Sequence, residues 1–234
     1  MLNILLTRPQ AQARHLADAL IAQGVQPDQI IIDPILKIAP IEAHCDITAG
    51  TGLIITSANA LSYLPAALRG SQLPCYCVGH ATSQAARALG LKAYHLADTA
   101  KALCEALPTR GHKGPLLHLR GTHTTLDMAK HFRSTSLRVK NLVVYEQIAL
   151  PLQAETHEKL RQSSPVVLPI FSARSARLLG KLALDWHRHW AVALSPAIAE
   201  LCREAGFGQI TTAAQPNRQA MMAVITPLMG VKSG

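Results

Sequence analysis

Aromatic residues and long apolar runs are both scarce in this sequence. Phe, Trp and Tyr make up 4% of the 234 residues. Polar residues, Gly or Pro interrupt each apolar run well before the ~18 residues that a transmembrane helix needs. Proteins that bind single-stranded nucleic acid interleave aromatic rings with their basic residues. The composition therefore argues against a membrane protein and against a binder of single strands.

Motifs for nucleotides, metals and disulfides are missing as well. Without a GxGxxG or GxxxxGKS/T loop, no nucleotide cofactor is expected. The five cysteines are odd in number and contain no CxxC pair, which favours reduced thiols in a cytoplasmic protein over zinc or disulfides. Cys75 and Cys77 share one face of a predicted strand and are expected to pack. His187-Arg188-His189 has metal-like spacing but no third ligand nearby, so we predict no metal site and a solvent-exposed segment.

The charge is strongly one-sided. Twenty-three Lys and Arg oppose fourteen Asp and Glu, which gives a formal net charge of +9. Such a protein favours anionic partners, and nucleic acid, an anionic membrane surface and an anionic small molecule are all candidates. The basic residues are scattered and form no Lys/Arg run. We therefore favour a small anionic ligand, with no nucleic acid and no membrane as partner.

Length and hydrophobic pattern indicate two α/β lobes. Hydrophobic residues make up 49% and charged residues 16% of the chain, enough to build two cores. Strand-sized apolar runs alternate with amphipathic helical segments such as 10–23 and 59–68, which predicts parallel sheets covered by helices on both faces. The first residues, Met1 to Pro9, look like a first strand and not like a signal peptide.

Two proline-bounded extended segments, 30–41 and 139–150, read as a connector between the lobes. If they pair, the chain crosses between the lobes twice. The predicted domains are then 1–34 with 149–234, a discontinuous α/β domain, and 35–148, a second α/β domain.

One kind of corner occurs twice. Residues 53–61 read as a buried strand, a turn containing Thr56 and Ser57, and the start of a helix, and residues 166–176 repeat that pattern. Free amides and the positive dipole end make such a corner a seat for an anion. Arg8 and Arg120 end two further strands that correspond to each other, and the Cys77-to-Thr82 turn resembles the Ala193-to-Ile198 turn. These echoes predict a duplicated α/β unit whose ligand lies beyond the carboxyl ends of the strands, in a cleft between the lobes.

Taken in order, these motifs resemble the uroporphyrinogen-III synthase family over nearly the whole chain. The matching segments are Leu6-Thr7-Arg8-Pro9, Ile55-Thr56-Ser57-Ala58-Asn59-Ala60, Val78-Gly79-His80-Ala81-Thr82 with Gly90, Leu119-Arg120-Gly121, Val144-Tyr145-Glu146 and Phe171-Ser172-Ala173-Arg174-Ser175-Ala176. The resemblance implies two flavodoxin-like α/β lobes joined by a two-stranded ladder. It also implies an activity: a lyase of porphyrin and heme biosynthesis that closes the linear tetrapyrrole hydroxymethylbilane into uroporphyrinogen III, inverting the last pyrrole and losing water. Two segments depart from the family pattern, Thr122-His123-Thr124-Thr125 and Ile198.

The resemblance also implies site residues. Tyr145 is the candidate catalytic residue, as a proton donor or an orienting group for the departing hydroxyl. The candidate contacts to substrate carboxylates are Thr7, Arg8, Thr56, Ser57, Asn59, Gly79, Thr82, Arg120, Gly121, Ser172, Ser175 and Ser195. For the hydroxyl and amide residues, simple capping of their own helices is the alternative, and the two arginines could instead form surface salt bridges.

Two other functions remain open at this point. A two-lobed binding or sensor protein could close on an anionic ligand without transforming it, and the net charge alone permits a nucleic-acid binder. We expect a cytoplasmic monomer without a cofactor, with transient contact to the enzyme that precedes it in the pathway as a possibility.

Overall fold

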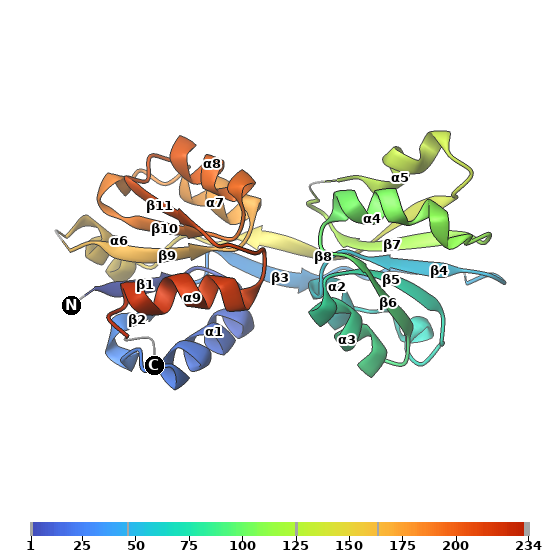
Figure 1. The fold of residues 1–234 in the computed structure, drawn as a ribbon, viewed down its shortest axis with the longest axis horizontal. Coiled ribbons are helices and arrows are strands. Elements are labelled where there is room, and N and C mark those ends of the chain that lie inside the picture. Colours follow the sequence, from blue (N-terminus) through green and yellow to red (C-terminus); the bar gives the residue numbers. More distant parts are fainter. Residues whose placement is uncertain (1, 46, 125, 163, 232–234) are drawn as a thin grey trace. The chain divides into compact units, whose positions relative to one another are not determined.

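The computed structural model describes residues 2–45, 47–124, 126–162 and 164–231. The chain forms two compact units, one from Met1–Lys37 with Ile148–Gly234 and the other from Ile38–Gln147. We call them unit 1 and unit 2. Each contains one sheet with helices on both of its faces (Figure 1), so the predicted α/β class with two parallel-dominated sheets is confirmed.

Unit 1 is built on a sheet of five strands in the order β11-β10-β9-β1-β2, and its strand pairs are parallel. Its elements are β1 (Asn3–Leu6), α1 (Gln10–Ala22), β2 (Ile30–Ile32), α6 (Ala154–Arg161), β9 (Val166–Ile170), α7 (Ala173–Leu179), β10 (Trp190–Ala193), α8 (Pro196–Glu204), β11 (Gln209–Thr212) and α9 (Arg218–Leu228).

Unit 2 carries a sheet of six strands in the order β3-β8-β7-β4-β5-β6, in which the pairs from β8 to β6 are parallel. Its elements are β4 (Gly52–Ile55), α2 (Asn59–Ser62), β5 (Pro74–Val78), α3 (His80–Ala88), β6 (Lys92–Ala97), α4 (Ala100–Ala106), β7 (Leu116–Gly121) and α5 (Met128–His131).

Two strands carry the chain from one unit to the other. They are β3 (Leu36–Pro40) and β8 (Val139–Ala149), which are neighbours in the sheet. Ile41 N donates to Val144 O at 3.0 Å, and Leu150 N donates to Ile35 O at 2.9 Å. The partners advance in opposite directions along the two segments, as they do in an antiparallel pair. The predicted two-stranded connector is therefore present.

The internal repeat is visible in the strand order. Counting unit 1 from β9 through β10, β11, β1 and β2 gives the order 3-2-1-4-5. Counting unit 2 from β4 to β8 gives the same order, with β3 added at the edge. The motif pairs found in the sequence thus lie on equivalent strands, β4 with β9, β5 with β10 and β7 with β1. The point where the order reverses lies between β9 and β1 in unit 1 and between β4 and β7 in unit 2, and such points are where ligands bind in these folds.

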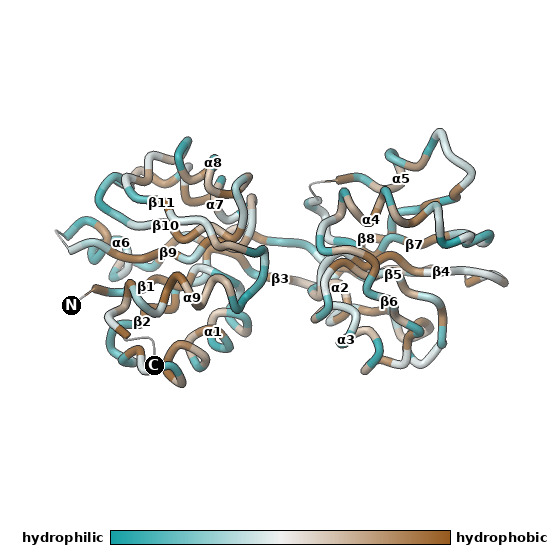
Figure 2. Tube along the Cα trace, viewed as in Figure 1, coloured by the Kyte–Doolittle hydropathy of each residue, from teal (hydrophilic) through white to brown (hydrophobic). Residues whose placement is uncertain are grey.

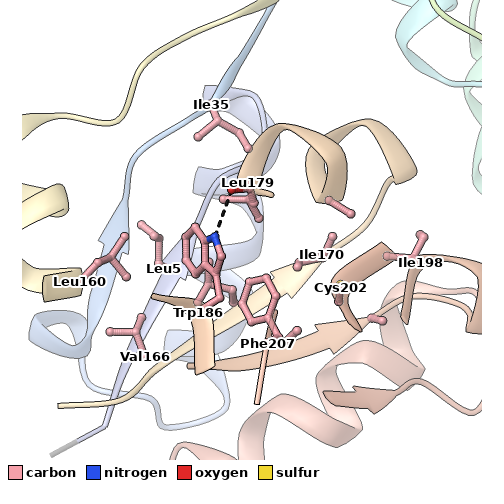
Figure 3. Close-up of a cluster of buried hydrophobic side chains, with 14 of the residues drawn as sticks. Leu5, Ile35, Leu160, Val166, Ile170, Leu179, Trp186, Ile198, Cys202 and Phe207 are labelled. Atoms are coloured by element: carbon pink, nitrogen blue, oxygen red, sulfur yellow. Dashed lines mark hydrogen bonds between the residues drawn. The ribbon is translucent and has the colours of Figure 1, made fainter. Parts of the chain in front are cut away.

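Each sheet separates two hydrophobic cores, because side chains alternate between the faces of a strand. In β1, Leu5 packs with residues of α7 and α8, whereas Ile4 and Leu6 pack with α1 and α9. On the first side, Trp186 donates its indole N–H to Leu179 O at 3.1 Å and stacks on Phe207, with ring centroids 4.9 Å apart (Figure 3). The central strands are largely hydrophobic and many of the surrounding loops are hydrophilic, as Figure 2 shows.

A proline limits the ladder between the two central strands of unit 1. Ile170 O accepts from Leu194 N on the β10 side, and successive residues face opposite neighbours, so Pro169 faces β1. Proline has no N–H to donate. The described pairing of β9 with β1 accordingly runs only from Val166 to Val167.

Several predicted elements have different bounds. The helix predicted over 59–68 is a single turn, α2, because Pro65 cannot continue it, and a 3-10 turn at Ala66–Leu68 follows. The extended segment predicted over 139–150 is the single strand β8, which ends one residue earlier at Ala149. Cys75 and Cys77 pack in β5 as predicted, with 3.5 Å between their sulfur atoms, and none of the five cysteines is in a disulfide.

The prediction that residues 187–189 are exposed was wrong for His189. Its side chain is fully buried, accepts from Val166 N at 3.3 Å and bonds Leu160 O at 3.1 Å. Burial lowers the pKa of His189, and it lowers the pKa of the fully buried His118 in β7 to about 4. Both rings are neutral at physiological pH. They hold strand and helix segments together.

The buried histidines predict acid sensitivity. The unfolded chain takes up a proton on each His near pH 6.5, whereas His118 stays neutral down to about pH 4, so lowering the pH across this window favours the unfolded state. One such group removes about 3 kcal/mol from the free energy of unfolding over the window. Denaturant titrations at neutral pH and at about pH 4.5 should therefore differ less for His118→Asn than for the wild type. His44→Asn, at a side chain that is 90% exposed, should behave as the wild type. Identical pH dependence of His118→Asn and wild type would contradict this assignment.

Candidate functional site

A pocket of about 430 Å³ lies at the carboxyl edge of the unit 1 sheet. Residues that follow β1, β9, β10 and β11 contribute to it, so it lies where the strand order reverses and where the β1–β9 ladder has ended. Its lining consists of Arg8, Ala11, Gln12, His15, Leu16, Phe171, Leu194, Pro216, Asn217 and Arg218.

Arg8 gives this pocket its chemistry. Its guanidinium carbon lies 4.1 Å from the ring centroid of Phe171, and Nη2 donates to Gln12 Oε1 at 3.0 Å. Burial, and next the charge of Arg218, lowers the pKa of Arg8 to about 10, so the side chain remains charged at neutral pH. No carboxylate of the described residues forms an ion pair with Arg8 or Arg218. Two cations without an acidic partner, beside an apolar wall, suit an anionic ligand with an apolar body.

The hydroxyl residues predicted as carboxylate contacts in unit 1 differ in their burial and in the hydrogen bonds that their side chains already make. Ser172 caps α7, since its Oγ accepts from Ser175 N at 3.0 Å and lies 2.8 Å from Ser175 Oγ. Ser195 begins α8, but its side chain makes no capping bond. Thr7 and Ser175 are only 1% and 7% exposed. Of the contacts that the sequence predicts in unit 1, Arg8 is a lining residue of the pocket.

The corner after β4 in unit 2 was predicted to seat an anion. Thr56 is partly buried, and its hydroxyl lies 3.2 Å from His118 Nε2 on the neighbouring β7. Ser57 Oγ accepts from Asn59 N at 3.3 Å, so this serine caps its own turn. Thr56 and His118 meet where the strand order of unit 2 reverses, the position equivalent to the pocket of unit 1.

Gly79 lies at the next corner of unit 2, between β5 and α3. Its φ of +79° is in the left-handed region, which side chains with a Cβ rarely adopt, so the backbone requires glycine there. Its N–H donates to Ala97 O at 2.8 Å. Thr82, in the first turn of α3, is 7% exposed.

Arg120, Gly121 and Tyr145 form a compact group at the end of β7 and in β8. Arg120 Nη1 donates to Gly121 O at 2.8 Å and to Thr122 O at 3.1 Å. Its Nε is buried, and no group in the described ranges accepts a bond from it. The Tyr145 ring is 4% exposed and packs on Gly121, where an added Cβ would lie 2.5 Å from Cε2 of the ring. Tyr63 lies beside it, with ring centroids 6.2 Å apart.

Several residues of these sites were not predicted from the sequence, among them Phe171, Asn217, Arg218 and His118. The sequence pattern places Phe171 at the end of a strand, and no motif singles out Arg218. Asn217 caps α9 through a 2.8 Å bond to Ala220 N, a position that an Asn after a strand could have indicated. No local sequence pattern marks His118 as a buried histidine that bonds a neighbouring strand end.

The two segments that depart from the family pattern, residues 122–125 and Ile198, differ in the exposure of their described residues. Thr122 and Thr124 are exposed, while Thr125 lies outside the described residues. Ile198 lies in α8, is 7% exposed and packs in the core that α7 and α8 share, where a hydroxyl residue would contribute less apolar contact.

The described residues contain neither a cluster of metal ligands nor a helix suited to a membrane. No three His, Cys, Asp or Glu side chains in the described ranges come together as metal ligands. Among the helices in these ranges, none has both the length and the apolar character needed to cross a membrane.

Comparison with known proteins gives a consistent result. The family model described as uroporphyrinogen-III synthase HemD matches residues 14–223. The structure of uroporphyrinogen-III synthetase from Helicobacter pylori is similar with a TM-score of 0.69 at 18% identity, over 97% of this chain and 100% of that chain. A mutant uroporphyrinogen III synthase from Thermus thermophilus is similar with a TM-score of 0.58 at 14% identity, over 100% of both chains. The curated proteins contain no match.

At these identities, the structural similarity establishes the fold. The family model covers most of the chain, including the corners after β4, β5, β7 and β9 and the segment around Tyr145. The chain therefore belongs to the uroporphyrinogen-III synthase family, the cyclising lyases that form uroporphyrinogen III in tetrapyrrole biosynthesis.

Proposed function

We propose that this protein closes hydroxymethylbilane into uroporphyrinogen III, with inversion of the last pyrrole ring and loss of water, and that the carboxyl edges of both sheets contact the substrate. Each pyrrole of that substrate carries an acetate and a propionate on an apolar ring. The observation that carries the proposal is the pocket of unit 1, where Arg8 and Arg218 lack an acidic partner among the described residues.

The pocket suits one segment of such a substrate. The guanidinium of Arg8 can bind a carboxylate through two parallel hydrogen bonds. The ring of Phe171 packs against the guanidinium and holds it in place. Helix α9 begins at the pocket, so its positive dipole end favours an anion in the same place. Ser195 supplies a hydroxyl that is not used in capping. In unit 2, Ser57, Asn59, Gly79, Thr82, Arg120 and Gly121 are the proposed contacts, as the sequence predicts.

The reaction asks little acid–base chemistry of the protein. The hydroxymethyl group departs with help from the pyrrole nitrogen, and ring closure without inversion is spontaneous. The protein must hold the chain so that the other carbon of the last ring meets the cation, which is catalysis by positioning. Tyr145 serves as a proton donor to the departing hydroxyl through its phenol group. No cofactor enters this scheme.

The cellular setting is part of the same proposal. The unbridged cysteines fit a reducing compartment, and we infer a cytoplasmic enzyme that acts as a monomer. Because its substrate cyclises spontaneously, transient contact with the enzyme that releases hydroxymethylbilane would shorten the time available for the wrong closure.

Product analysis tests the proposed function. Hydroxymethylbilane generated enzymatically should give mainly the inverted isomer with the protein present and the uninverted isomer without it. A protein that binds the tetrapyrrole and leaves the uninverted isomer as product would be a binding protein and would contradict the proposal.

Arg8→Gln should weaken substrate binding. The change removes a charge-assisted contact worth about 1.5–3 kcal/mol, so KM should rise about 10- to 100-fold while the melting temperature changes little. Arg161→Gln is the matched control, because it removes the same charge from an exposed residue at the end of α6, before β9 begins. Equal KM values for Arg8→Gln and Arg161→Gln would show that only net charge matters.

Tyr145→Phe should lower kcat by about 100-fold with KM nearly unchanged, since it removes the phenol proton and leaves the packed ring. Gly121→Ala should also lower kcat, because the new Cβ displaces the Tyr145 ring. Tyr94→Phe, at a tyrosine that is 38% exposed, is the control for losing a phenol elsewhere in unit 2. If the folded Tyr145→Phe variant has the same kcat as the wild type, Tyr145 is not a catalytic residue.

A further inference from the structure

A chain of four polar side chains crosses unit 2 from its carboxyl edge to a helix start. Thr56 Oγ1 lies 3.2 Å from His118 Nε2, and His118 Nδ1 lies 3.3 Å from Asn141 Oδ1. Asn141 Nδ2 donates to Asp127 Oδ1 at 2.8 Å, and Asp127 also caps α5 by accepting from Lys130 N at 3.1 Å. The four residues come from the end of β4, from β7, from β8 and from the residue before α5.

The direction of every bond in this chain follows from its last member. The bonds from Asn141 and Lys130 lower the pKa of Asp127, so its carboxylate is ionised and can only accept. The Asn141 side chain must therefore turn its NH₂ group toward Asp127. Its oxygen then faces His118 Nδ1, and an oxygen without a hydrogen requires a donor there.

His118 is consequently the Nδ1–H tautomer. The ring is fully buried, and burial lowers its pKa to about 4, against the raising effects of Asn141 and Asp127; the charge of Arg120 on the same strand lowers it further. The ring is thus neutral and carries one hydrogen, which goes to Asn141. Nε2 is left with a lone pair, and among the described residues the Thr56 hydroxyl is the group that lies within hydrogen-bond distance to donate to it.

We propose that this chain fixes Thr56 as a hydrogen-bond acceptor at the carboxyl edge of unit 2, and that Thr56 receives a pyrrole N–H of the substrate instead of donating to a carboxylate. A hydroxyl whose hydrogen is committed to His118 has only lone pairs left for a ligand. The substrate offers both kinds of group, since every ring has one N–H besides its acid chains. This inference rests on the proposed function and replaces the carboxylate contact that the sequence predicts for Thr56. His118, Asn141 and Asp127 are positioning residues that act through Thr56.

Nitrogen NMR of protein labelled with ¹⁵N-histidine tests the tautomer directly. We expect His118, identified by the resonances missing from His118→Asn, to show a protonated Nδ1 and an unprotonated, hydrogen-bonded Nε2 at neutral pH. The same pattern should persist with reduced uroporphyrinogen III bound. An Nε2–H tautomer, an imidazolium, or loss of the bond to Nε2 when the tetrapyrrole binds would overturn the proposal.

Kinetics with hydroxymethylbilane tests the contact itself. Thr56→Val, which keeps the shape and loses the acceptor, should raise KM about 10-fold, and Thr56→Ser should stay within about twofold of the wild type. Melting temperatures of both variants verify that they fold. If the Thr56→Val variant has the same KM as the wild type, the proposed contact between Thr56 and the pyrrole N–H is wrong. A wild-type protein that forms only the uninverted isomer contradicts the proposed function instead, so the two failures are distinguishable.

Discussion

The parallel order of the two sheets is the constraint on which the site depends. In a parallel sheet, every strand ends at the same edge and every following helix begins there, so that the polar corners gather even though they are far apart in the sequence. Both units have the same strand order once unit 1 is counted from β9. The equivalent reversal points therefore carry Arg8 and Phe171 in unit 1, and Thr56 and His118 in unit 2.

The two reversal points have diverged in chemistry. In unit 1, Pro169 ends the ladder with β1, and a pocket with two cations beside an aromatic ring lies beyond it. In unit 2, a hydrogen bond between the Thr56 hydroxyl and the buried His118 links the end of β4 to β7 at the equivalent position. The first suits the acid chains of a tetrapyrrole, and the second suits a hydrogen-bond donor.

The sequence predicted the fold better than the site. Continuous apolar strands such as β4 and β9, ended by hydroxyl residues, identify parallel sheets, and the proline-bounded segments identified the connector. Pro65 explains why a helical pattern over 59–68 yields one turn, and β8 continues through a stretch where the pattern weakens. These errors are local and do not change the topology.

The site depends on contacts that no local pattern contains. That Arg8 lies over Phe171, or that His118 meets both Thr56 and Asn141, follows from strand register across the sheet. The prediction that His189 is exposed was wrong for the same reason, since its burial comes from its contacts with α6 and β9. A sequence can indicate which residues lie at the carboxyl edge, but which hydrogen each hydroxyl donates depends on the whole network.

A crystal structure with uroporphyrinogen III bound and kept reduced would measure directly whether the tetrapyrrole lies at the carboxyl edges of the sheets. We expect a carboxylate of the tetrapyrrole within hydrogen-bond distance of Arg8 and Arg218, and other polar contacts at the corners that follow β4, β5 and β7. A tetrapyrrole bound at the amino ends of the strands, with these corners untouched, would contradict it.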